Sequence, residues 1–437
     1  MLKTATNIIK KLNQNGYEAY FVGGCVRDEL IGLTPKDYDV TTNARGHQLL
    51  ELFPGSKLIG QSYEICLVDG VEVAPYRMDT ECDGYDTKAV YDVSLEDDLS
   101  RRDFTINAIA MDRLNNYALI DPFDGLHDLN RKIIRFVGDP HKRLSEHWIR
   151  AVHAARFAAR FGFEIEETAL TILKENASMI AEKIIPEGLM LEFEKARPFF
   201  PAFILKLDEI GLLCNLFPIL GLMKGLEQNP EYHPEGDCFA HTMRVLYVMR
   251  TASPILPVWM AALFHDTGKV TTTETDENGK ITSKKHERES ARIAEGYMNY
   301  LKVSNEFKDL VVNLCLNHMK ILHSDITKKL VRRLIRDYGK EFVCHLYILT
   351  ACDAMGGSRD GRGPERLWKL INEIMQEKPR PQSPISGKEI MERYSIEPGP
   401  EVGKLKNIVA DLQLERDETM TKEEAWEVLD DYINAQN

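Results

Sequence analysis

The pattern of apolar and polar residues divides the chain into a strand-rich part and a helical part. Apolar residues at helical spacing over 4–15, then Gly16 and the alternating run AYFV, predict a helix, a turn and a strand. Further strand-like runs follow at 57–59, 65–68, 71–76, 89–93 and 117–120. Long stretches of helical periodicity come later, among them 142–161, 167–183, 241–251, 287–302, 306–318 and 365–377. No strand-like run follows residue 140, so we predict an α+β head with one mixed sheet and then an all-α body.

Composition and cysteine usage are those of an ordinary globular protein. Its 437 residues, of which 43% are hydrophobic and 28% charged, suit about three domains and exclude disordered and collagen-like classes. The eight cysteines form no C-x-x-C pair and a chain of this size needs no disulfide staples, so we expect reduced thiols. The N-terminus lacks signal-peptide features, and no apolar stretch approaches the ~18 residues of a membrane span. We therefore expect a soluble cytoplasmic protein without a membrane partner.

Charge limits how this chain could bind a polyanion. With 55 basic and 68 acidic residues the net charge is −13, so attraction to nucleic acid cannot come from the molecule as a whole. Residues 131–160 nevertheless carry eight Lys and Arg against two acidic residues, which is the local patch that an RNA backbone requires. A second basic cluster, TKKLVRRLIRDYGK (327–340), fits either an RNA contact or the solvated face of a helix.

The stretch FVGGCVRDELIGLTPKDYDV, residues 21–40, carries the first candidate chemistry. A strand that ends in Gly23-Gly24 leaves backbone N–H groups free to approach a polyphosphate, and Arg27 falls one turn into the helix that follows. Asp37 and Asp39 are expected on one face of a strand, where two carboxylates can share divalent ions. Metal-dependent phosphoryl transfer uses such a pair to activate an attacking oxygen and to neutralise the departing pyrophosphate.

Glu72, in the strand-like run GVEVAPY, is a candidate third carboxylate of the same site. Taken singly, a GG turn or a D-x-D pair is far more often a plain turn or a solvated strand edge than part of a catalytic site. Their conjunction in one short stretch is much more specific, and it predicts metal-dependent transfer of nucleotidyl groups.

Five motifs occur in a fixed order over most of residues 20–165. They are GGCVRD, the D-x-D pair, LEDDLSRRDFTINAIAMD (95–112), DPFDGLHDL (121–129) and FVGDPHKRLSEHWIRAVHAARFAARFGF (136–163). This series resembles the class II tRNA nucleotidyltransferases and bacterial poly(A) polymerases, and PISGKEIMERYSIEPGPEVGK (384–404) is similar to their C-terminal part. The resemblance implies a polymerase beta-like head, Mg²⁺ at the transferase site, CTP and ATP as substrates, and the tRNA 3′ end as partner.

The resemblance also implies roles for the residues that match these motifs. Asp37 and Asp39 would hold the catalytic Mg²⁺ ions. The residues that would bind the triphosphate and the ribose are Gly23, Gly24, Arg27, Asp28, Arg101, Arg102, Asp103 and Asn107. Without the flanking match, the RRD sequence fits equally a capped helix start with a surface ion pair.

The helix expected over residues 143–161 would read the base in place of a nucleic-acid template. The family uses a Glu-Asp-x-x-Arg sequence for this, whereas this chain has Glu146-His147-x-x-Arg150. Glu146, Arg150 and His153 fall at i, i+4 and i+7 on one stripe of the helix, and Arg156 belongs to the same nucleotide-binding set. His147 stands where the family has Asp, and His153 where it usually has Arg. The departures touch base selection and leave the transfer chemistry intact.

A further departure lies in DTECDGYDTKAVYDV, residues 79–93. The corresponding loop of the family commonly carries D-G-x-Y-x-D-x-R-R-P and is associated with the switch from C to A addition. The loop here is shorter and lacks the RRP, so CC-only, A-only and poly(A) addition stay open beside complete CCA addition.

A second candidate site lies in the helical body. His241, the pair His265-Asp266 in ALFHDTGK, and Asp353 in TACDAMGG occur in the order H…HD…D. Imidazole and carboxylate ligands from separate helices suit a divalent metal, such as Mn²⁺ or Ni²⁺, that makes a hydroxide for phosphate-ester hydrolysis. This order resembles the HD phosphohydrolase superfamily, which implies phosphodiesterase and phosphatase activity; an HD fold without metal is the alternative. Further candidate ligands are His286 and His318.

These observations predict four parts of the chain. They are a nucleotidyltransferase head (1–125), a helical nucleotide-recognition and RNA-binding neck (126–225), an HD domain (226–380) and a C-terminal helical tail (381–437). Pro, Gly and Asn cluster near the two later boundaries, in LEQNPEYHPEGDC and EKPRPQSPIS. We expect a template-independent tRNA nucleotidyltransferase that adds CCA and carries an HD phosphohydrolase site. The alternative from another class is an HD phosphohydrolase whose head only binds nucleotide.

Overall fold

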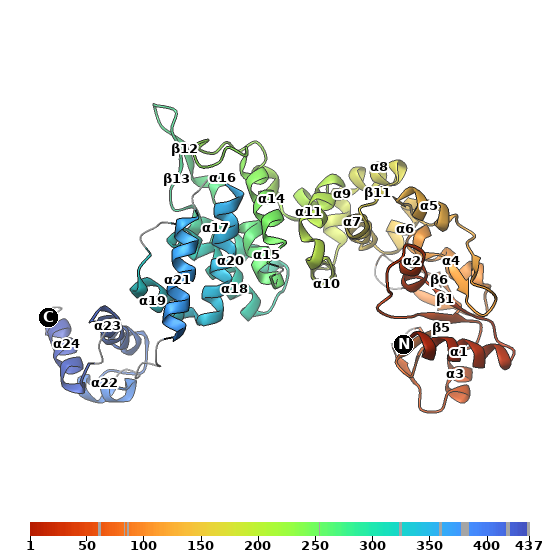
Figure 1. Ribbon diagram of the computed structural model, residues 1–437, viewed down its shortest axis with the longest axis horizontal. Coiled ribbons are helices and arrows are strands. Elements are labelled where there is room, and N and C mark those ends of the chain that lie inside the picture. The colour runs from red at the N-terminus through yellow and green to blue at the C-terminus, as the bar shows by residue number, and fades with distance from the viewer. Residues whose placement is uncertain are drawn as a thin grey trace. The chain divides into compact units, whose positions relative to one another are not determined.

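Figure 1 shows the computed structural model, in which the chain forms two units. The first unit comprises Met1–Leu222 with Tyr300–Val303, and the second comprises Met223–Asn299 with Ser304–Asn437. The structure describes residues 1–59, 63–82, 84, 87–252, 254–322, 326–357, 361–376, 384–416 and 420–434. Within these residues, no helix has both the length and the apolar character that crossing a membrane requires.

A seven-stranded sheet forms the core of the N-terminal head. Its order is β3-β4-β5-β2-β1-β8-β9, with β2 and β5 parallel and all other neighbours antiparallel, which confirms the predicted mixed sheet. The bounds are β1 Ala19–Val22, β2 Val40–Thr42, β3 Lys57–Ile59, β4 Ile65–Val68, β5 Val71–Pro75, β8 Ala110–Asp112 and β9 Ala118–Ile120. Helix α1 (Leu2–Gln14) buries Ala5, Ile8, Ile9 and Leu12, the stripe that its sequence pattern predicts.

One expected strand lies apart from this sheet. The run at 89–93 falls in β7 (Lys88–Val90), which pairs with β6 (Met78–Thr80) in a separate two-stranded sheet. None of the six residues in these two strands is buried, so the pair has no apolar face to pack into the head core. The short helices of the head are α2 Gly24–Leu30, α3 Gly46–Leu52, α4 Leu95–Ser100 and the 3₁₀ turn η1 Thr105–Asn107.

The helix predicted over residues 142–161 is two helices, α6 (Pro140–Glu146) and α7 (Arg150–Phe161). His147 has an extended backbone, with φ −153° and ψ 104°, because it forms a parallel β-bridge with Gly84. The helix predicted over 167–183 is broken in the same way at Asn176, between α8 (Glu167–Glu175) and α9 (Ala177–Lys183). Apolar periodicity continues across both breaks, so the sequence pattern alone does not reveal them.

Helices α10 (Pro186–Ala196) and α11 (Phe200–Glu209) pack against α7, which buries eight of its twelve residues. The remaining helices of the first unit are α5 Gly125–Arg131, α12 Leu212–Leu216 and α13 Pro218–Leu222, with the 3₁₀ turn η2 Arg197–Phe199. The short strands β10 (Ile133–Ile134) and β11 (Glu164–Ile165) pair in parallel across this region. The second of these strands lies beyond residue 140, where the sequence predicts none.

Helices dominate the second unit, as predicted, with α20 packed against its neighbours α14, α15, α18, α19 and α21 (Figure 1). Their bounds are α14 Cys238–Met249, α15 Leu256–Phe264, α16 Lys269–Thr272, α17 His286–Tyr300, α18 Asn305–Asn317, α19 Lys328–Tyr338, α20 Lys340–Gly356 and α21 Arg362–Gln376, with the 3₁₀ turn η3 His318–Lys320. A hairpin of β12 (Thr273–Thr275) and β13 (Ile281–Ser283) was not predicted, since strands of three residues are too short to show a period of two.

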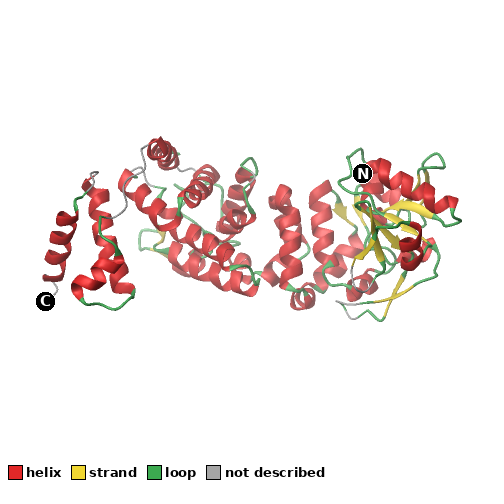
Figure 2. Cartoon of the chain, turned by 90° about the horizontal axis from the view of Figure 1, so that it is seen from below, coloured by secondary structure: helices red, strands yellow, loops and turns green. Residues whose placement is uncertain are grey.

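The C-terminal helices α22 (Gly387–Tyr394), α23 (Pro400–Arg416) and α24 (Lys422–Asn434) share their own small core. Its buried residues are Ile385, Ile390, Val402, Leu405, Val409, Ala425 and Leu429. In Figure 2 the yellow strands gather in the N-terminal head, while red helices make up most of the remaining chain. The predicted α+β fold with a helical body is therefore what the structure has.

Candidate functional site

The glycine turn after β1 lies directly against an arginine of the RRD motif. Gly23 has φ +75°, a conformation that favours glycine, and a Cβ built there would lie 2.9 Å from Nη1 of Arg102. Arg102 also donates from Nη2 to Asp98 at 3.3 Å, while its buried Nε has no hydrogen-bond partner among the described residues. The Gly23 turn and the RRD motif, which are far apart in the sequence, therefore lie in contact. The Nε–H of Arg102 remains available as a hydrogen-bond donor among the described residues.

The guanidinium of Arg27, by contrast, already donates hydrogen bonds from all three of its nitrogens. It is 3% exposed, and its Nη1 donates to Oδ1 of Asn107 at 2.6 Å. Its Nε and Nη2 both donate to Oδ1 of Asp28, at 2.8 and 2.6 Å, and Arg160 donates to Oδ2 of the same carboxylate at 2.8 Å. Sequence inspection did not single out Arg160 for this contact. The arrangement fits Arg27 better as a support for Asn107 and Asp28 than as a direct phosphate ligand.

The residues of the RRD motif bind two different neighbours, Asp98 and Asn107. Arg101 pairs with Oδ1 of Asp98 at 2.7 Å, so both arginines of the motif share this fully buried carboxylate, which sequence reasoning missed. Asp103 accepts from Nδ2 of Asn107 at 2.9 Å, and Asn107 lies in the 3₁₀ turn η1. Burial alone would raise the pKa of Asp103, but the nearby His153 ring and a hydrogen bond from Asn107 outweigh it and hold that pKa at about 2. Asp103 is therefore an anion, ready to accept from a hydroxyl.

The three predicted catalytic carboxylates come together around the β2–β5 pair. Asp37 and Asp39 lie in the segment that leads into β2 and not within the strand as predicted, while Glu72 lies on β5, which is parallel to β2. Burial, followed by the negative charges of Asp37 and Glu72, raises the pKa of Asp39 to about 6. Their ligand atoms do not form one of the described clusters within 4.8 Å. The negative charges of Asp37 and Glu72 nevertheless act on Asp39, and a bound divalent ion would offset the repulsion among the three carboxylates.

The predicted base-reading residues form two separate networks because the helix is broken at His147. In the first, Glu146 accepts from Nη2 of Arg143 at 2.6 Å and from Nη1 of Arg150 at 2.7 Å. Arg150 also donates to the backbone carbonyl of Arg101 at 2.9 Å, which ties it to the RRD motif. This network holds Arg150 beside the residues that the motifs predict to bind ribose and phosphate.

The second network joins His153 and Arg156 to a carboxylate outside all the motifs. His153 lies between Oδ2 of Asp103, at 3.7 Å from Nδ1, and Oε1 of Glu192, at 3.6 Å from Nε2. Glu192, on α10, also pairs with Arg156 and with Lys195. Burial alone would lower the pKa of His153, but these two carboxylates raise it. His153 thus holds Asp103 in place and does not share a stripe with Glu146.

The basic count over residues 131–160 is not a wholly exposed patch. Arg143, Arg150 and Arg156 are at most 9% exposed and pair with acidic residues. In the second basic cluster, Arg332 is buried and Lys328 pairs with Glu373. Only part of each cluster is thus available to an RNA backbone.

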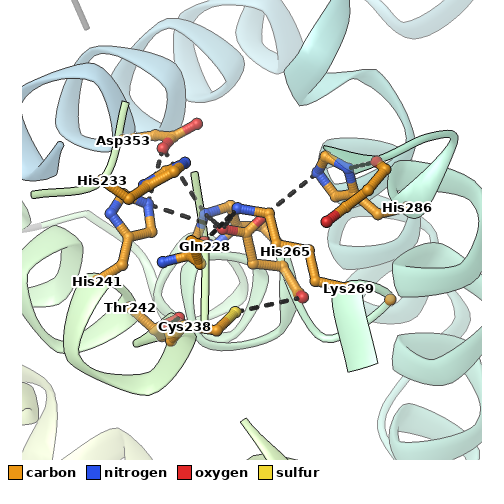
Figure 3. A network of polar contacts seen from close by, with 12 residues as sticks. Gln228, His233, Cys238, His241, Thr242, His265, Lys269, His286 and Asp353 are labelled. Carbon is orange, nitrogen blue, oxygen red and sulfur yellow. Dashed lines mark hydrogen bonds and ion pairs between the residues drawn. The ribbon is translucent and has the colours of Figure 1, made fainter. Parts of the chain in front are cut away.

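The H…HD…D residues converge in the core of the second unit (Figure 3). Nε2 of His241 lies 3.0 Å from Oδ1 of Asp353 and 3.7 Å from Oδ2 of Asp266, and Nε2 of His265 lies 3.3 Å from the same Asp266 oxygen. All four residues are at most 3% exposed. The structure therefore brings together the complete predicted ligand set.

Three histidines of this centre have one ring nitrogen fixed by a backbone carbonyl. Nδ1 of His265, His286 and His318 lies 2.8, 2.9 and 2.7 Å from the carbonyl oxygens of Ala262, Ser283 and Cys315. Each Nδ1 must donate to its carbonyl, so each Nε2 is left as a lone-pair ligand atom. The Nε2 atoms of His286 and His318 face each other at 3.3 Å, and Nε2 of His265 has no hydrogen-bond partner in the described chain.

Ligand atoms fall into three groups of three, each within 4.8 Å. Two groups share the Asp266 region: His241, His265 and Asp353 form one, and Asp266, His286 and His318 the other. Facing lone pairs, an orphaned imidazole nitrogen and buried carboxylates together fit divalent metal, with His and Asp ligands that suit Mn²⁺ or Ni²⁺.

The third group contains two residues that sequence reasoning missed, His233 and Glu235. Oε1 of Glu235 lies 3.0 Å from Nδ1 of His233 and also accepts from Nδ1 of His241. Both residues stand in LEQNPEYHPEGDC, which the Pro, Gly and Asn content identifies only as a boundary. Both residues lie within eight positions of His241, so their closeness in the sequence to a predicted ligand is the signal that could have identified them.

Two family matches agree with these two sites. Residues 19–135 match the family described as the poly A polymerase head domain, and residues 238–366 match the HD domain family. The chain is 33% identical over 377 residues to the multifunctional CCA protein of Methylobacillus flagellatus, which covers 82% of this chain and 88% of that protein. It is 40% identical over 220 residues to the CCA-adding enzyme of a Geobacillus species, covering 48% of this chain and 54% of that one.

Solved structures show the same fold. The Bacillus stearothermophilus CCA-adding enzyme in complex with CTP has a TM-score of 0.71 at 24% identity, and covers 100% of this chain and 98% of its own. The Thermotoga maritima CCA-adding enzyme complexed with tRNA has a TM-score of 0.59 at 20% identity, covering 99% of this chain and 95% of its own. The resemblance stated from the motifs is thereby confirmed.

Proposed function

The chain belongs to the family of CCA-adding enzymes and multifunctional CCA proteins, and we propose that it adds C and A nucleotides to the 3′ end of tRNA from CTP and ATP. Relatives with these names, and similar structures solved with CTP, ATP or tRNA, support the proposal. The observation that carries it is the contact of Arg102 with the Gly23 turn beside three interacting carboxylates. An HD enzyme whose head only binds nucleotide would not need that carboxylate set.

Each polar group of the head has a place in the proposed transfer. The 3′-hydroxyl of the RNA loses its proton to solvent and its oxygen bonds to the α-phosphorus of the nucleotide, while the bond from that phosphorus to the bridging β-phosphate oxygen breaks and pyrophosphate leaves. Mg²⁺, when bound by Asp37 and Asp39 with Glu72 nearby, supplies charge neutralisation and activation of the attacking oxygen. Arg102 and the backbone N–H groups at Gly23-Gly24 hold the triphosphate, while the Asp103–Asn107 pair orients the ribose.

Base selection rests on Arg150 and His147. Glu146 fixes the guanidinium of Arg150, whose donor fork matches the acceptor atoms of cytosine or adenine. His147 is half-buried at the break between α6 and α7, where one ring nitrogen can accept from an exocyclic amine. His153 and Arg156 act at a distance, through Asp103 and Glu192.

Incubation with each labelled nucleotide on tRNA that lacks CCA tests this proposal. We expect incorporation of CTP, followed by ATP, and little UTP or GTP. Arg102→Ala should reduce incorporation strongly, while Arg366→Ala, an exposed arginine on α21, should not. Sustained incorporation of ATP alone would identify a poly(A) polymerase of the same family instead.

We further propose that the centre around Asp266 is a metal-dependent phosphohydrolase site within the HD domain, residues 226–380. The convergence of His241, His265, His286 and His318 on two buried carboxylates is the observation that favours this second function. A bound divalent metal would supply a hydroxide for attack on a phosphate ester. Metal analysis after reconstitution with Mn²⁺ or Ni²⁺ tests it: we expect bound metal in the wild type and much less in His265→Ala. Absence of metal from the wild type would favour an HD fold without hydrolase function.

A further inference from the structure

The ring of His153, on α7, lies between two carboxylates that come from different parts of the chain. Its Nδ1 is 3.7 Å from Oδ2 of Asp103, and its Nε2 is 3.6 Å from Oε1 of Glu192. Glu192 lies on the buried face of α10, beside Leu189 and Phe193, where the helix is otherwise apolar. Burying a carboxylate there is costly unless cations accompany it, so its charge must be matched by its neighbours.

The protonation state of His153 decides how many of these carboxylates its ring can serve. A neutral imidazole carries one N–H, whereas an imidazolium carries two. Only the protonated ring can therefore present a donor to Asp103 and to Glu192 at the same time. Burial lowers the pKa of His153, but the two carboxylates outweigh it and raise that pKa above its ordinary value. The ring is thus protonated at about pH 6.5 and loses its proton as the pH rises further.

Loss of this proton leaves Glu192 with other cations. Oε1 of Glu192 accepts from Nζ of Lys195 at 2.7 Å, and Oε2 pairs with the guanidinium of Arg156. An arginine keeps its charge at every pH at which proteins work. The side chain of Glu192 is therefore held by two further partners whether or not His153 is protonated.

Loss of the same proton has a larger effect on Asp103, because its two oxygens have different partners. Oδ1 accepts from the backbone N–H of Phe104 at 2.8 Å and from Nδ2 of Asn107 at 2.9 Å. Oδ2 pairs with His153 and, among the described residues, with no other group. The side chain of Asp103 is 20% exposed, so a substrate can reach it. In either tautomer the neutral ring takes its charge away from Oδ2, which is the oxygen left to accept from a substrate hydroxyl.

The other charged groups near His153 do not change with it. Arg27 and Arg102 act on Asp103 through their charges and stay protonated. His147 also senses the charge of His153, but burial lowers the pKa of His147, so this ring is already neutral when His153 loses its proton. His153 is therefore the group of this network whose charge changes above about pH 6.5.

We propose that His153 sets the preference of the transferase for ribose over deoxyribose: its protonated ring holds Oδ2 of Asp103 toward the sugar hydroxyls, and Glu192 keeps the ring protonated. The inference rests on the transferase function proposed above and adds to it a group that determines sugar selectivity. A deoxyribonucleotide has no 2′-hydroxyl to donate to this carboxylate, so loss of the orientation weakens the ribonucleotide more. His153 and Glu192 act through Asp103 and are positioning residues.

The kcat/KM of CTP divided by that of dCTP, measured between about pH 6 and about pH 9.5 on tRNA that lacks CCA, tests this inference. Protonation of the catalytic carboxylates, of His147 and of the attacking hydroxyl affects both nucleotides alike and cancels in the ratio. We expect the wild-type ratio to fall about tenfold as the pH rises, because the contact with the 2′-hydroxyl is weakened.

Three variants assign this dependence to the ring of His153. His153→Arg is charged at every pH and should keep the ratio within about threefold of the wild-type value at about pH 6.5. His153→Gln has no charge and should hold the ratio about tenfold lower throughout. Glu192→Gln removes a carboxylate that raises the pKa of His153, so the fall should move to lower pH. The matched controls are His47→Gln, an exposed histidine on α3, and Glu194→Gln, an exposed carboxylate on α10, and both should keep the wild-type profile.

A wild-type ratio that stays constant over this range would overturn the inference, as would a His153→Gln ratio equal to that of wild type at about pH 6.5. Wild type that incorporates neither nucleotide contradicts the transferase function instead. Calorimetry with CTP and dCTP at about pH 6.5 then tests the inference, through the Kd of dCTP divided by that of CTP. A quotient about tenfold larger in wild type than in His153→Gln would retain the inference, and equal quotients would overturn it.

Discussion

The transferase head and the HD centre are built for ligands of opposite charge. In the head, the buried Nε of Arg102, beside the Gly23 turn, has no hydrogen-bond partner among the described residues, so the site awaits an anion that each substrate brings. In the HD centre, carboxylates and imidazole lone pairs gather in groups whose ligand atoms lie within 4.8 Å of one another, so the site awaits a resident cation. The difference teaches that a substrate site keeps a spare donor for an anion that comes and goes, whereas a metal site gathers several acceptor atoms for a cation that stays.

The largest expected effect comes from removing one carboxylate of the head, which should affect nucleotide addition and leave the HD centre unchanged. Asp39→Ala should reduce nucleotide addition by about 1,000-fold or more, because Asp39 would hold the catalytic metals, while tRNA binding stays within a few fold. Hydrolysis at the HD centre should not change. Primer extension on tRNA lacking CCA measures the rate, with Glu51→Ala, an exposed carboxylate on α3, as control. Addition at near wild-type rate would remove Asp39 from the site.

The reverse separation uses Asp266, a carboxylate that lies beside histidines of both groups. Asp266→Ala should remove bound divalent metal and lower phosphodiesterase activity by at least about 100-fold, since Asp266 lies 3.3 Å from His265 and 3.1 Å from His286. Nucleotide addition should be retained. Metal analysis and both activity assays are compared with Asp309→Ala, an exposed carboxylate on α18. A variant that keeps full metal content would contradict the proposed ligand set.

A smaller effect tests how the HD centre orients its ligands. Glu235 accepts from Nδ1 of His241, which leaves Nε2 of that ring to face Asp353. Glu235→Ala should weaken metal binding about 10- to 100-fold without abolishing it, because the ring loses its fixed orientation. Competition with a chelator measures this affinity. An affinity equal to wild type would show that the backbone alone positions His241.

The smallest effect concerns base selection in the head. Burial and the nearby charge of Arg150 lower the pKa of His147, so its ring stays neutral at pH 7.5 and gains its second proton only below its ordinary pKa of about 6.5. The CTP-to-UTP preference should therefore be constant from pH 7.5 to 6.5 and fall by roughly tenfold only at lower pH. His147→Asp should flatten this dependence. A preference that does not vary down to pH 5 in wild type would show that His147 does not contact the base.

The sequence predicted much of both sites because their chemistry lies in local motifs. Gly23 and Arg102, and likewise the H…HD…D residues, occur in short runs whose residue types indicate their chemistry. The structure brings each of these two sets together at its own site. The strand at 65–68 and the apolar stripe of α1 were equally visible, since burial imposes a period that the sequence retains.

Features that depend on tertiary contacts were not visible. The break at His147 follows from a backbone bridge to Gly84, which no local pattern encodes. Glu192 became part of a site only because α10 folds against His153, which is far away in the sequence, whereas Glu235 lies six residues before His241 in a segment that shows no regular pattern. The unbroken helix predicted to carry Glu146, Arg150 and His153 was wrong for the same reason: Glu146 and Arg150 still pair, but His153 belongs to another network.

The nucleotides that the chain adds to tRNA test the proposed CCA addition most directly. The measurement is the length and composition of products on three tRNAs, lacking all of CCA, lacking the last two nucleotides, or lacking only the final A. The account predicts that each is restored to a complete CCA end and that addition then stops, equally in wild type and in Asp266→Ala. Products that end after CC, receive only the terminal A, or extend as poly(A) would contradict it.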